Sequence, residues 1–146
     1  MKPEIEYLYS GILSIMLLSM LIWGEARGEI DLGKSAVAWV VRNRVYARRD
    51  YGDGWEGVML KEKQFSCFNG EDVNKERMKE ILFTRSMWGK FRECFGIALG
   101  VYLGIGDDPT KGATHYTVIG LKPLWRLKMV ETVKIGNHVF YKYEDE

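Results

Sequence analysis

An uncharged apolar stretch near the start of the chain constrains its fold more than any other feature. It runs for 18 residues, from Tyr7 to Gly24, and Glu25 follows it directly. The stretch contains no proline and is too long for a strand, so it predicts a helix, which Gly28 should end. We therefore expect a helix over residues 4–26 that carries the Glu25 carboxylate at its C-terminal end.

The same stretch lies at the lower limit of the length with which a helix spans a membrane. The segment before it, residues 1–6, has more acidic than basic groups, unlike the basic start of a signal peptide. We expect a buried core helix and no stable membrane insertion, and a membrane-inserted helix is the alternative. Small and weakly polar residues recur at helical spacing on one face, at Tyr7, Ser10, Gly11 and Ser14.

The composition fits one globular domain that spans residues 1–146. Apolar residues make up 47% of the chain and charged residues 28%, and the net charge is +1. These values are typical of soluble domains, and so small a charge would not steer the chain to nucleic acid or to acidic membranes. We expect a monomer with no nucleic acid partner. The four arginines between residues 42 and 49 should form a solvated helix face, with contact to an anionic polymer as the alternative.

Cysteine and histidine are too few to build a covalent or metal framework. Cys67 and Cys94 each precede a phenylalanine, and a free cysteine is most often a small buried apolar residue. One disulfide between them is the alternative if the protein works outside a cell. Two histidines leave a zinc site short of ligands unless cysteines or carboxylates join them. We expect no metal or organic cofactor.

The rest of the chain predicts more helices, followed by a small antiparallel sheet. Apolar residues recur along one side of residues 31–48, and Asp31 can cap that helix. Gly136-Asn137 between two alternating segments is a hairpin signal. The domain is therefore predicted to be α+β, mainly helical with the sheet in its C-terminal part. The remaining elements are expected as a short element at 55–61, helices at 74–88 and 90–103, and strands at 113–119, 128–135 and 138–143.

Glu25 is the candidate catalytic group. Partial burial at the end of an apolar helix disfavours the charged carboxylate, so the pKa of Glu25 should rise. A carboxylic acid that keeps its proton near neutral pH can give it to a leaving oxygen, as the cleavage of a glycosidic bond requires. An exposed Glu at a helix end is the structural alternative.

A second carboxylate, Glu29, follows four residues later. Retaining and inverting glycosidases need two carboxylates across the scissile bond, and in a continuous helix Glu29 would share a face with Glu25. Because Gly28 should break the helix, two roles are open for Glu29. It contacts the substrate, or it caps the next helix or pairs with Arg27 or Lys34.

Four segments, in this order, resemble one protein family. They lie at residues 21–29, 33–45, 64–69 and 108–116 and read LIWGEARGE, GKSAVAWVVRNRV, QFSCFN and DPTKGATHY. Together they look like the SleB-type cell-wall hydrolases, which include the catalytic domains of spore-cortex-lytic enzymes and of some phage endolysins. The resemblance covers residues 18–141, nearly the whole chain.

This resemblance implies a lysozyme-like fold related to that of lytic transglycosylases, with Glu25 as the catalytic acid and peptidoglycan as the substrate. In that mechanism one Glu protonates the oxygen between N-acetylmuramic acid and N-acetylglucosamine. It then takes a proton from the muramoyl 6-hydroxyl as the 1,6-anhydro ring closes. Hydrolysis by a muramidase is the alternative outcome. The missing signal peptide pattern favours a phage or prophage endolysin that stays in the cytoplasm until it is released to the wall.

The third segment supplies two candidate substrate-binding residues, Gln64 and Ser66. They flank Phe65, so at strand spacing both would point the same way while Phe65 turns to the core. An amide beside a hydroxyl suits hydrogen bonding to the N-acetyl and hydroxyl groups of a sugar. A loop that satisfies its own backbone is the alternative.

The C-terminal part supplies three more candidates. His115 and Tyr116 lie on the first predicted strand, where His115 either lines the groove or is a structural residue. Trp125 stacks on a sugar face or packs internally. Asn43 and His138 are expected to be structural.

Two other functions stay open. A zinc-dependent N-acetylmuramoyl-L-alanine amidase would need His115, His138 and a carboxylate as ligands. A protein without catalytic activity would be a glycan-binding module or a membrane-inserted lysis factor built on residues 7–24.

Overall fold

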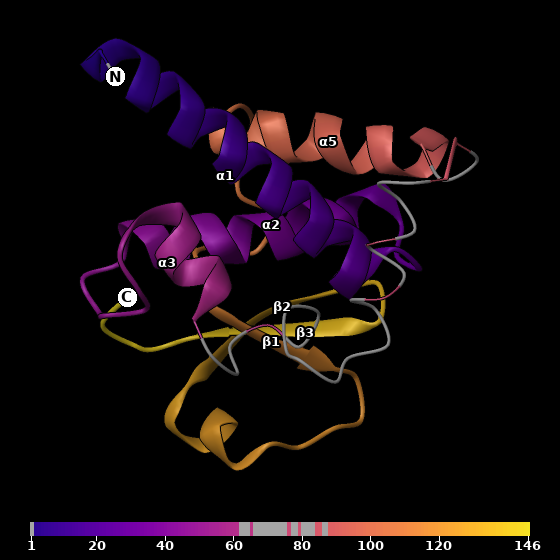
Figure 1. The fold of residues 1–146 in the computed structure, drawn as a ribbon. Helices are drawn as coiled ribbons and strands as arrows, with labels where there is room; N and C mark the ends of the chain where they lie inside the picture. Colours follow the sequence, from indigo (N-terminus) through magenta and orange to yellow (C-terminus); the bar gives the residue numbers. More distant parts are fainter. Residues whose placement is uncertain (1, 62–64, 66–75, 77–78, 80–83, 86–87) are drawn as a thin grey trace.

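The computed structural model describes residues 2–61 and 88–146, together with residues 65, 76, 79, 84 and 85. Helices occupy the first part of the chain and strands the last (Figure 1), which confirms the predicted α+β class. The α-helices are α1 (Pro3–Ala26), α2 (Asp31–Tyr46), α3 (Gly54–Leu60) and α5 (Trp88–Tyr102). After them come β1 (His115–Val118), a 3-10 helix (Leu124–Lys128), β2 (Val130–Ile135) and β3 (His138–Lys142).

Helix α2 forms the middle layer of the domain. In Figure 1 it lies between the α1–α5 pair on one side and the sheet on the other. Val37 and Val41 belong to the main core cluster with the helices, whereas Ala36 and Val40 pack with Phe140 of the sheet. A helix buried on two sides can be rich in small and β-branched apolar residues, because both of its faces meet neighbours.

The sheet is antiparallel with the strand order β1-β3-β2. The predicted hairpin is confirmed, since Gly136 and Asn137 join β2 to β3, and Gly136 adopts the positive φ of 56° that the turn requires. Tyr116 of β1 pairs with Phe140 of β3. Successive side chains on a strand point to opposite faces, so Tyr116 and Phe140 face α2, whereas His115 lies on the outer face.

One predicted cap is wrong, and several predicted boundaries differ from the observed ones by one or two residues. The N-cap of α2 is Ile30, whose side chain accepts no capping hydrogen bond, while Asp31 is the first helical residue. Asp31 instead lies 3.6 Å from the Lys34 ammonium one turn later. The 3-10 helix at Leu124–Lys128 was not expected. Most of the predicted helix at 74–88 falls outside the described residues.

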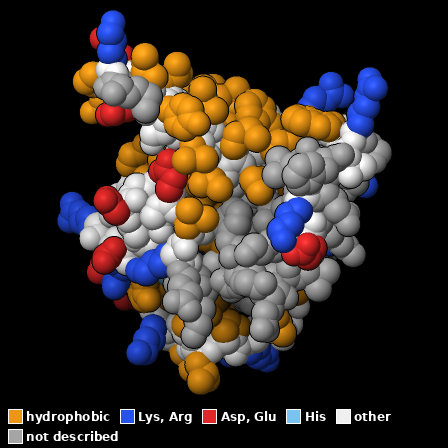
Figure 2. All heavy atoms as spheres, in the orientation of Figure 1, with side chains coloured by type: hydrophobic (Ala, Val, Ile, Leu, Met, Phe, Trp, Pro, Cys, Tyr) orange, Lys and Arg blue, Asp and Glu red, His pale blue; other side chains and the backbone are white. Residues whose placement is uncertain are grey.

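The prediction that α1 is a buried core helix is only half correct. From Leu18 to Ala26 the helix is largely buried, but its first half carries apolar side chains on the surface, visible at the upper left of Figure 2. Helix α1 is long and apolar enough to span a membrane, with a mean hydropathy of 1.8 over an 18-residue window. The rest of the domain buries 28% of that window. A uniformly apolar run shows that a helix forms, but not how far its neighbours extend beside it.

Candidate active site

Glu25 lies in the last turn of α1, where the helix reaches the sheet. Its side chain is half-buried, which confirms the predicted partial burial. The Tyr116 hydroxyl donates a hydrogen bond to Oε2 of Glu25 over a rather long 3.4 Å. The end of α1 and strand β1 therefore place a carboxylate and a phenol side by side.

Ring packing fixes the position of Tyr116. Its ring lies 5.8 Å from that of Phe140 and meets the ring of His138 edge-on at 5.2 Å. Both partners lie on β3, on the same face of the sheet as Tyr116. An aromatic side chain held on two sides keeps its hydroxyl in one place. The structure thus presents the phenol to Glu25 from a rigid support.

Glu29 faces His138, a partner that the sequence did not predict. Its Oε1 lies 3.1 Å from Nδ1 of His138, and both side chains are more than 90% buried. This is an ion-pair distance when His138 is protonated, but the two groups are not aligned as a hydrogen bond. Oε2 also accepts the backbone N–H of Asn137 at 3.3 Å. The alternative in which Glu29 pairs with Lys34 is not formed, because Lys34 contacts Asp31 and Glu93.

His115 and Trp125 lie on the other face of the sheet from Tyr116. The His115 ring packs 5.3 Å from Trp125 and 5.8 Å from Tyr143. Burial, together with the charge of Arg44, lowers the pKa of His115 to about 4, so this imidazole is neutral at physiological pH. The structure does not bring His115 or Trp125 to Glu25, and their contact with substrate stays a prediction.

The ligands of the alternative zinc site are not assembled. His115 is on the outer face of the sheet and His138 on the inner one, as the registers of β1 and β3 require. Within residues 2–61 and 88–146 no three His, Cys, Asp or Glu side chains gather closely enough to hold a metal ion. The geometry therefore speaks against the amidase.

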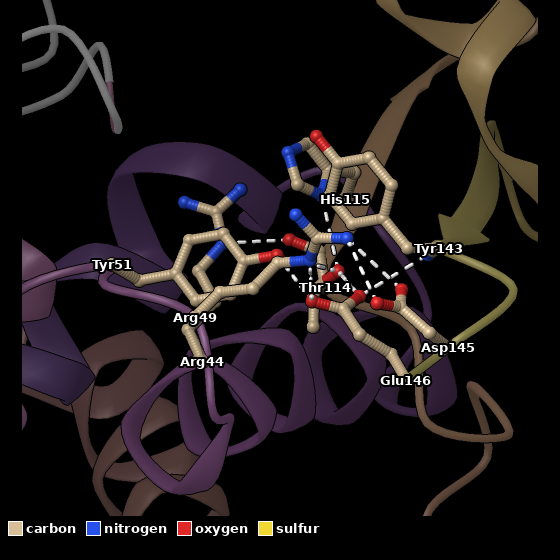
Figure 3. A network of polar contacts seen from close by, with 8 residues as sticks. All are labelled: Arg44, Arg49, Tyr51, Thr114, His115, Tyr143, Asp145 and Glu146. Atoms are coloured by element: carbon tan, nitrogen blue, oxygen red, sulfur yellow. Dashed lines mark hydrogen bonds and ion pairs between the residues drawn. The ribbon is translucent and has the colours of Figure 1, made fainter.

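A polar network anchors the start of β1 (Figure 3). The Glu146 carboxylate accepts hydrogen bonds from the hydroxyls of Thr114, at 2.6 Å, and Tyr51. Nε of Arg44 donates to the Thr114 carbonyl at 2.6 Å. Burial lowers the pKa of the Arg44 guanidinium and raises that of the Tyr51 phenol. A pocket of about 660 Å³ opens beside this network, but Glu25 does not line it.

Sequence reasoning missed the role of Arg44. The predicted solvated arginine face is wrong for two of its members, since Arg44 is buried and Arg42 donates to the carbonyls of Val101 and Tyr102. Arg48 and Arg49 are exposed as expected. The structural role of Asn43 is confirmed, because its Nδ2 donates to Asp108 Oδ2 at 2.8 Å and to the Ala113 carbonyl at 2.9 Å.

The third segment of the resemblance is described only at Phe65. Its side chain is buried and its ring lies 5.0 Å from the Arg44 guanidinium, which confirms that Phe65 turns to the core. Gln64, Ser66 and Cys67 lie outside the described residues. Cys94 is a buried free thiol, so the alternative disulfide is not formed.

A family model, curated relatives and solved structures all match this chain to cell-wall-degrading proteins. The family model described as cell wall hydrolase matches residues 28–141. Spore cortex-lytic enzymes of Bacillus cereus are 27% identical over 135 residues, an alignment that covers 88% of this chain and 44% of theirs. The chain thus spans less than half the length of these curated relatives. An alignment that covers 88% of this chain without a break leaves out too few residues to miss Glu25. The family model begins shortly after that residue, at residue 28.

Two solved structures have the same fold. The catalytic domain of the Bacillus cereus SleB protein is 25% identical with a TM-score of 0.65, and the match covers 88% of this chain and 89% of that one. The catalytic domain of the germination-specific lytic transglycosylase SleB from Bacillus anthracis is 24% identical with a TM-score of 0.65, covering 88% and 93%. The second likeness bears on the fold alone.

Proposed function

Since this chain belongs to the cell wall hydrolase family, and is thus an enzyme, we propose that it degrades peptidoglycan with Glu25 as its acid. The bond cleaved is the β-1,4 bond between N-acetylmuramic acid and N-acetylglucosamine. The observation that carries this proposal is the half-buried Glu25 carboxyl at the junction of α1 and the sheet, with the Tyr116 hydroxyl directed to it.

The protonated Glu25 gives its proton to the glycosidic oxygen as the bond to C1 of N-acetylmuramic acid breaks. The resulting carboxylate then accepts the proton of the muramoyl 6-hydroxyl, whose oxygen bonds to C1 and closes the 1,6-anhydro ring. The proton returns to Glu25, and no water is consumed. The hydrogen bond from Tyr116 favours the carboxylate formed midway, because a donor stabilises the charged acceptor.

A mechanism with one carboxylate suits this geometry better than a mechanism with two. Glu29 is the acidic residue that follows Glu25 most closely, and its oxygens face His138 and the Asn137 N–H. A carboxylate held in this way is not directed across a scissile bond from Glu25, where a glycosidase would need it. We therefore propose a lytic transglycosylase, with hydrolysis as the outcome to be tested against it.

The decisive experiment combines one substitution with product analysis. Glu25→Gln keeps the shape of the side chain but has no proton to give, so clearing of purified cell walls should fall at least about a thousandfold. The thermal midpoint should be unchanged, and the exposed Glu144→Gln should behave as wild type. Full activity of Glu25→Gln would refute the assignment.

Mass spectrometry of the released fragments distinguishes the reactions. Muropeptides lighter by one water than their reducing forms support the transglycosylase. Reducing ends indicate a muramidase, and free peptides with intact glycan, together with inhibition by a strong chelator, indicate the amidase.

We further propose the setting of a phage or prophage endolysin that acts from the cytoplasm. Expression inside a bacterial host should then cause lysis only when a separate membrane pore former is co-expressed. Lysis without a pore former would contradict this part of the proposal and leave the enzymatic one standing.

A further inference from the structure

A small cavity opens where the end of α1 meets the starts of α2 and α5, three helix ends that lie on one side of the molecule in Figure 1. Its volume is about 200 Å³. The described residues that line it are Trp23, Arg27, Lys34, Lys90, Glu93 and Cys94. We call it the basic pocket, because its lining has three cations and one carboxylate in a chain whose net charge is only +1.

The basic pocket is separate from the candidate active site. Trp23 and Arg27 are four residues apart and share one face of α1. The Arg27 guanidinium lies over the Trp23 ring, 4.9 Å from its centre. Glu25 lies midway between them and does not line the pocket. It projects from the opposite side of the helix, because each residue turns an α-helix by about 100°. The occupant of this pocket is therefore not the group that Glu25 protonates.

The three cations of the basic pocket lie at different depths. Lys90 is exposed, Arg27 is half-buried, and only 11% of the Lys34 side chain is exposed. Positive groups that extend from the surface into a cavity attract an anion and draw it inward.

The buried ammonium of Lys34 keeps N–H groups for a further acceptor. Its contacts with the carboxylates of Asp31 and Glu93 are both 3.6 Å long, which is longer than a hydrogen bond. Both carboxylates are largely exposed, so water weakens their attraction to the ammonium. A ligand that enters the pocket can approach Lys34 more closely than these partners do.

The indole N–H of Trp23 also lacks an acceptor. Trp23 is 2% exposed, and its Nε1 has no hydrogen-bond partner among the described residues. Buried donors in native proteins almost always have a partner, because a missing one costs free energy. Since Trp23 lines the basic pocket, an acceptor bound there can take this N–H.

Two helix N-termini strengthen the positive field. Lys34 lies in the first turn of α2 and Lys90 in the first turn of α5, and the N-terminus of a helix carries a partial positive charge that favours anions. Helix α1 contributes its C-terminus, which has the opposite sign, but Arg27 follows it directly as the C-cap residue. The ligand that fits this field is an anion.

We propose that the basic pocket binds a phosphate group. Such a group carries about −1.5 to −2 charges near neutral pH and several strong acceptor oxygens. It matches three cations and an unsatisfied N–H better than a carboxylate, which has one charge and two oxygens. The cavity is smaller than the pockets that enclose drug-sized ligands, so it suits one such group. The phosphate is either free in solution or carried by a polymer. The proposal does not depend on the catalytic role of Glu25.

Titration calorimetry with inorganic phosphate at constant ionic strength tests the pocket. We expect the wild type to bind with a Kd of about 1 mM or tighter. Arg27→Gln should weaken binding at least about tenfold, because a charged donor is lost from a half-buried position. Lys90→Gln should weaken it about threefold, since an exposed charge contributes less. Arg92→Gln, an exposed residue of α5 that does not line the pocket, is the matched control and should bind like wild type.

Nitrogen-15 NMR locates the bound phosphate. The indole N–H signal of Trp23, which Trp23→Phe identifies by its absence, should move as inorganic phosphate is added. The same concentrations should leave this signal in place in Arg27→Gln. Glu25→Gln should bind phosphate like wild type, so failure of the proposed catalysis and failure of this site are distinguishable.

A second ligand distinguishes the two sources of phosphate. Glycerophosphoglycerol carries its phosphate as a diester, as the backbone of a phosphate polymer does. Binding of this diester as tightly as inorganic phosphate supports a polymer-bound group, and binding of inorganic phosphate alone supports the free ion.

Three results would overturn the proposal. One is a wild-type protein that does not bind phosphate at tens of millimolar, about the weakest range of a specific small ligand. Another is a Trp23 signal that stays in place while phosphate binds, which would put the anion elsewhere. The third is acetate that binds at least as tightly as phosphate, which would assign the pocket to carboxylates. Lys90→Gln, an exposed change, decides the role of the cations if Arg27→Gln does not fold.

Discussion

The buried carboxylate of Glu29 faces the buried imidazole of His138, with Oε1 and Nδ1 3.1 Å apart. The pair joins the loop after α1 to the first residue of β3. His138 also meets the Tyr116 ring edge-on, and the Tyr116 hydroxyl reaches Glu25. Glu29 and His138 are therefore positioning residues for the proposed site, because they hold the hairpin that supports Tyr116.

Removal of the charge of Glu29 should destabilise the fold. In Glu29→Gln the buried His138 loses its acidic partner, and we expect a loss of about 1–3 kcal/mol in the free energy of unfolding. Urea denaturation measures it. Glu131→Gln removes a half-exposed partner of Lys134 and should cost less than about 0.5 kcal/mol. Equal midpoints for the two variants would show that the pair is not a structural link.

Loss of the Tyr116 hydroxyl should slow catalysis more than it weakens binding. Tyr116→Phe keeps the packing on Phe140 and His138 but removes the donor to Glu25, so kcat should fall about tenfold with little change in KM. Tyr143→Phe, on the outer face of the sheet, serves as the control. An unchanged kcat for Tyr116→Phe would separate this hydroxyl from the reaction.

Asn43 should be important for stability. Its amide connects α2 to the turn before β1 through Asp108 and the Ala113 carbonyl. Asn43→Ala removes this donor from both acceptors, and Asp108 Oδ2 keeps only the backbone N–H of Gly112 among the described residues. We expect a loss of about 2 kcal/mol, seen as a lower denaturation midpoint. Arg48→Ala, at an exposed position just after α2, should change it little. A midpoint at the wild-type value for Asn43→Ala would contradict this role.

His115 should make the protein less stable in mild acid. Its pKa is lowered to about 4 in the fold, whereas an unfolded chain has a value of about 6.5. The unfolded state therefore binds the proton first, and stability falls as pH drops from about 6.5 to about 4, by about 3 kcal/mol in all. The fall should be smaller in His115→Gln, measured by urea denaturation across this range. Parallel stability profiles for the two proteins would refute the prediction.

Cys94 should be unreactive in the native protein. Burial raises the pKa of its thiol to about 11, and only the thiolate reacts with thiol reagents. In a Cys67→Ala variant, where Cys94 is the only thiol, labelling at mildly alkaline pH should be at least about a hundredfold slower than after unfolding. Rapid labelling of the folded variant would show that α5 opens readily.

Adjacent strand residues show what the sequence contained and sequence reasoning overlooked. His115 and Tyr116 are both candidates for substrate binding from the sequence, yet neighbours on one strand point to opposite faces. The structure places Tyr116 beside Glu25, whereas His115 packs against Trp125 and Tyr143 on the outer face of the sheet. The period of two residues was visible in the predicted strand. Which of the two faces the helices was not visible, because that depends on packing.

The sequence by itself determined the features that depend on near neighbours. The apolar run before Glu25 makes a helix, Gly136-Asn137 makes a hairpin, and the order of helices and strands makes an α+β domain. Backbone conformation follows from residues a few positions apart, so local spacing suffices for these features. Only the tertiary structure decided that Glu29 meets His138, that Arg44 is buried beneath β1, and that the first half of α1 leaves apolar side chains such as Leu8 and Tyr9 exposed. These outcomes depend on which surfaces meet in space, and no local pattern in the chain encodes that.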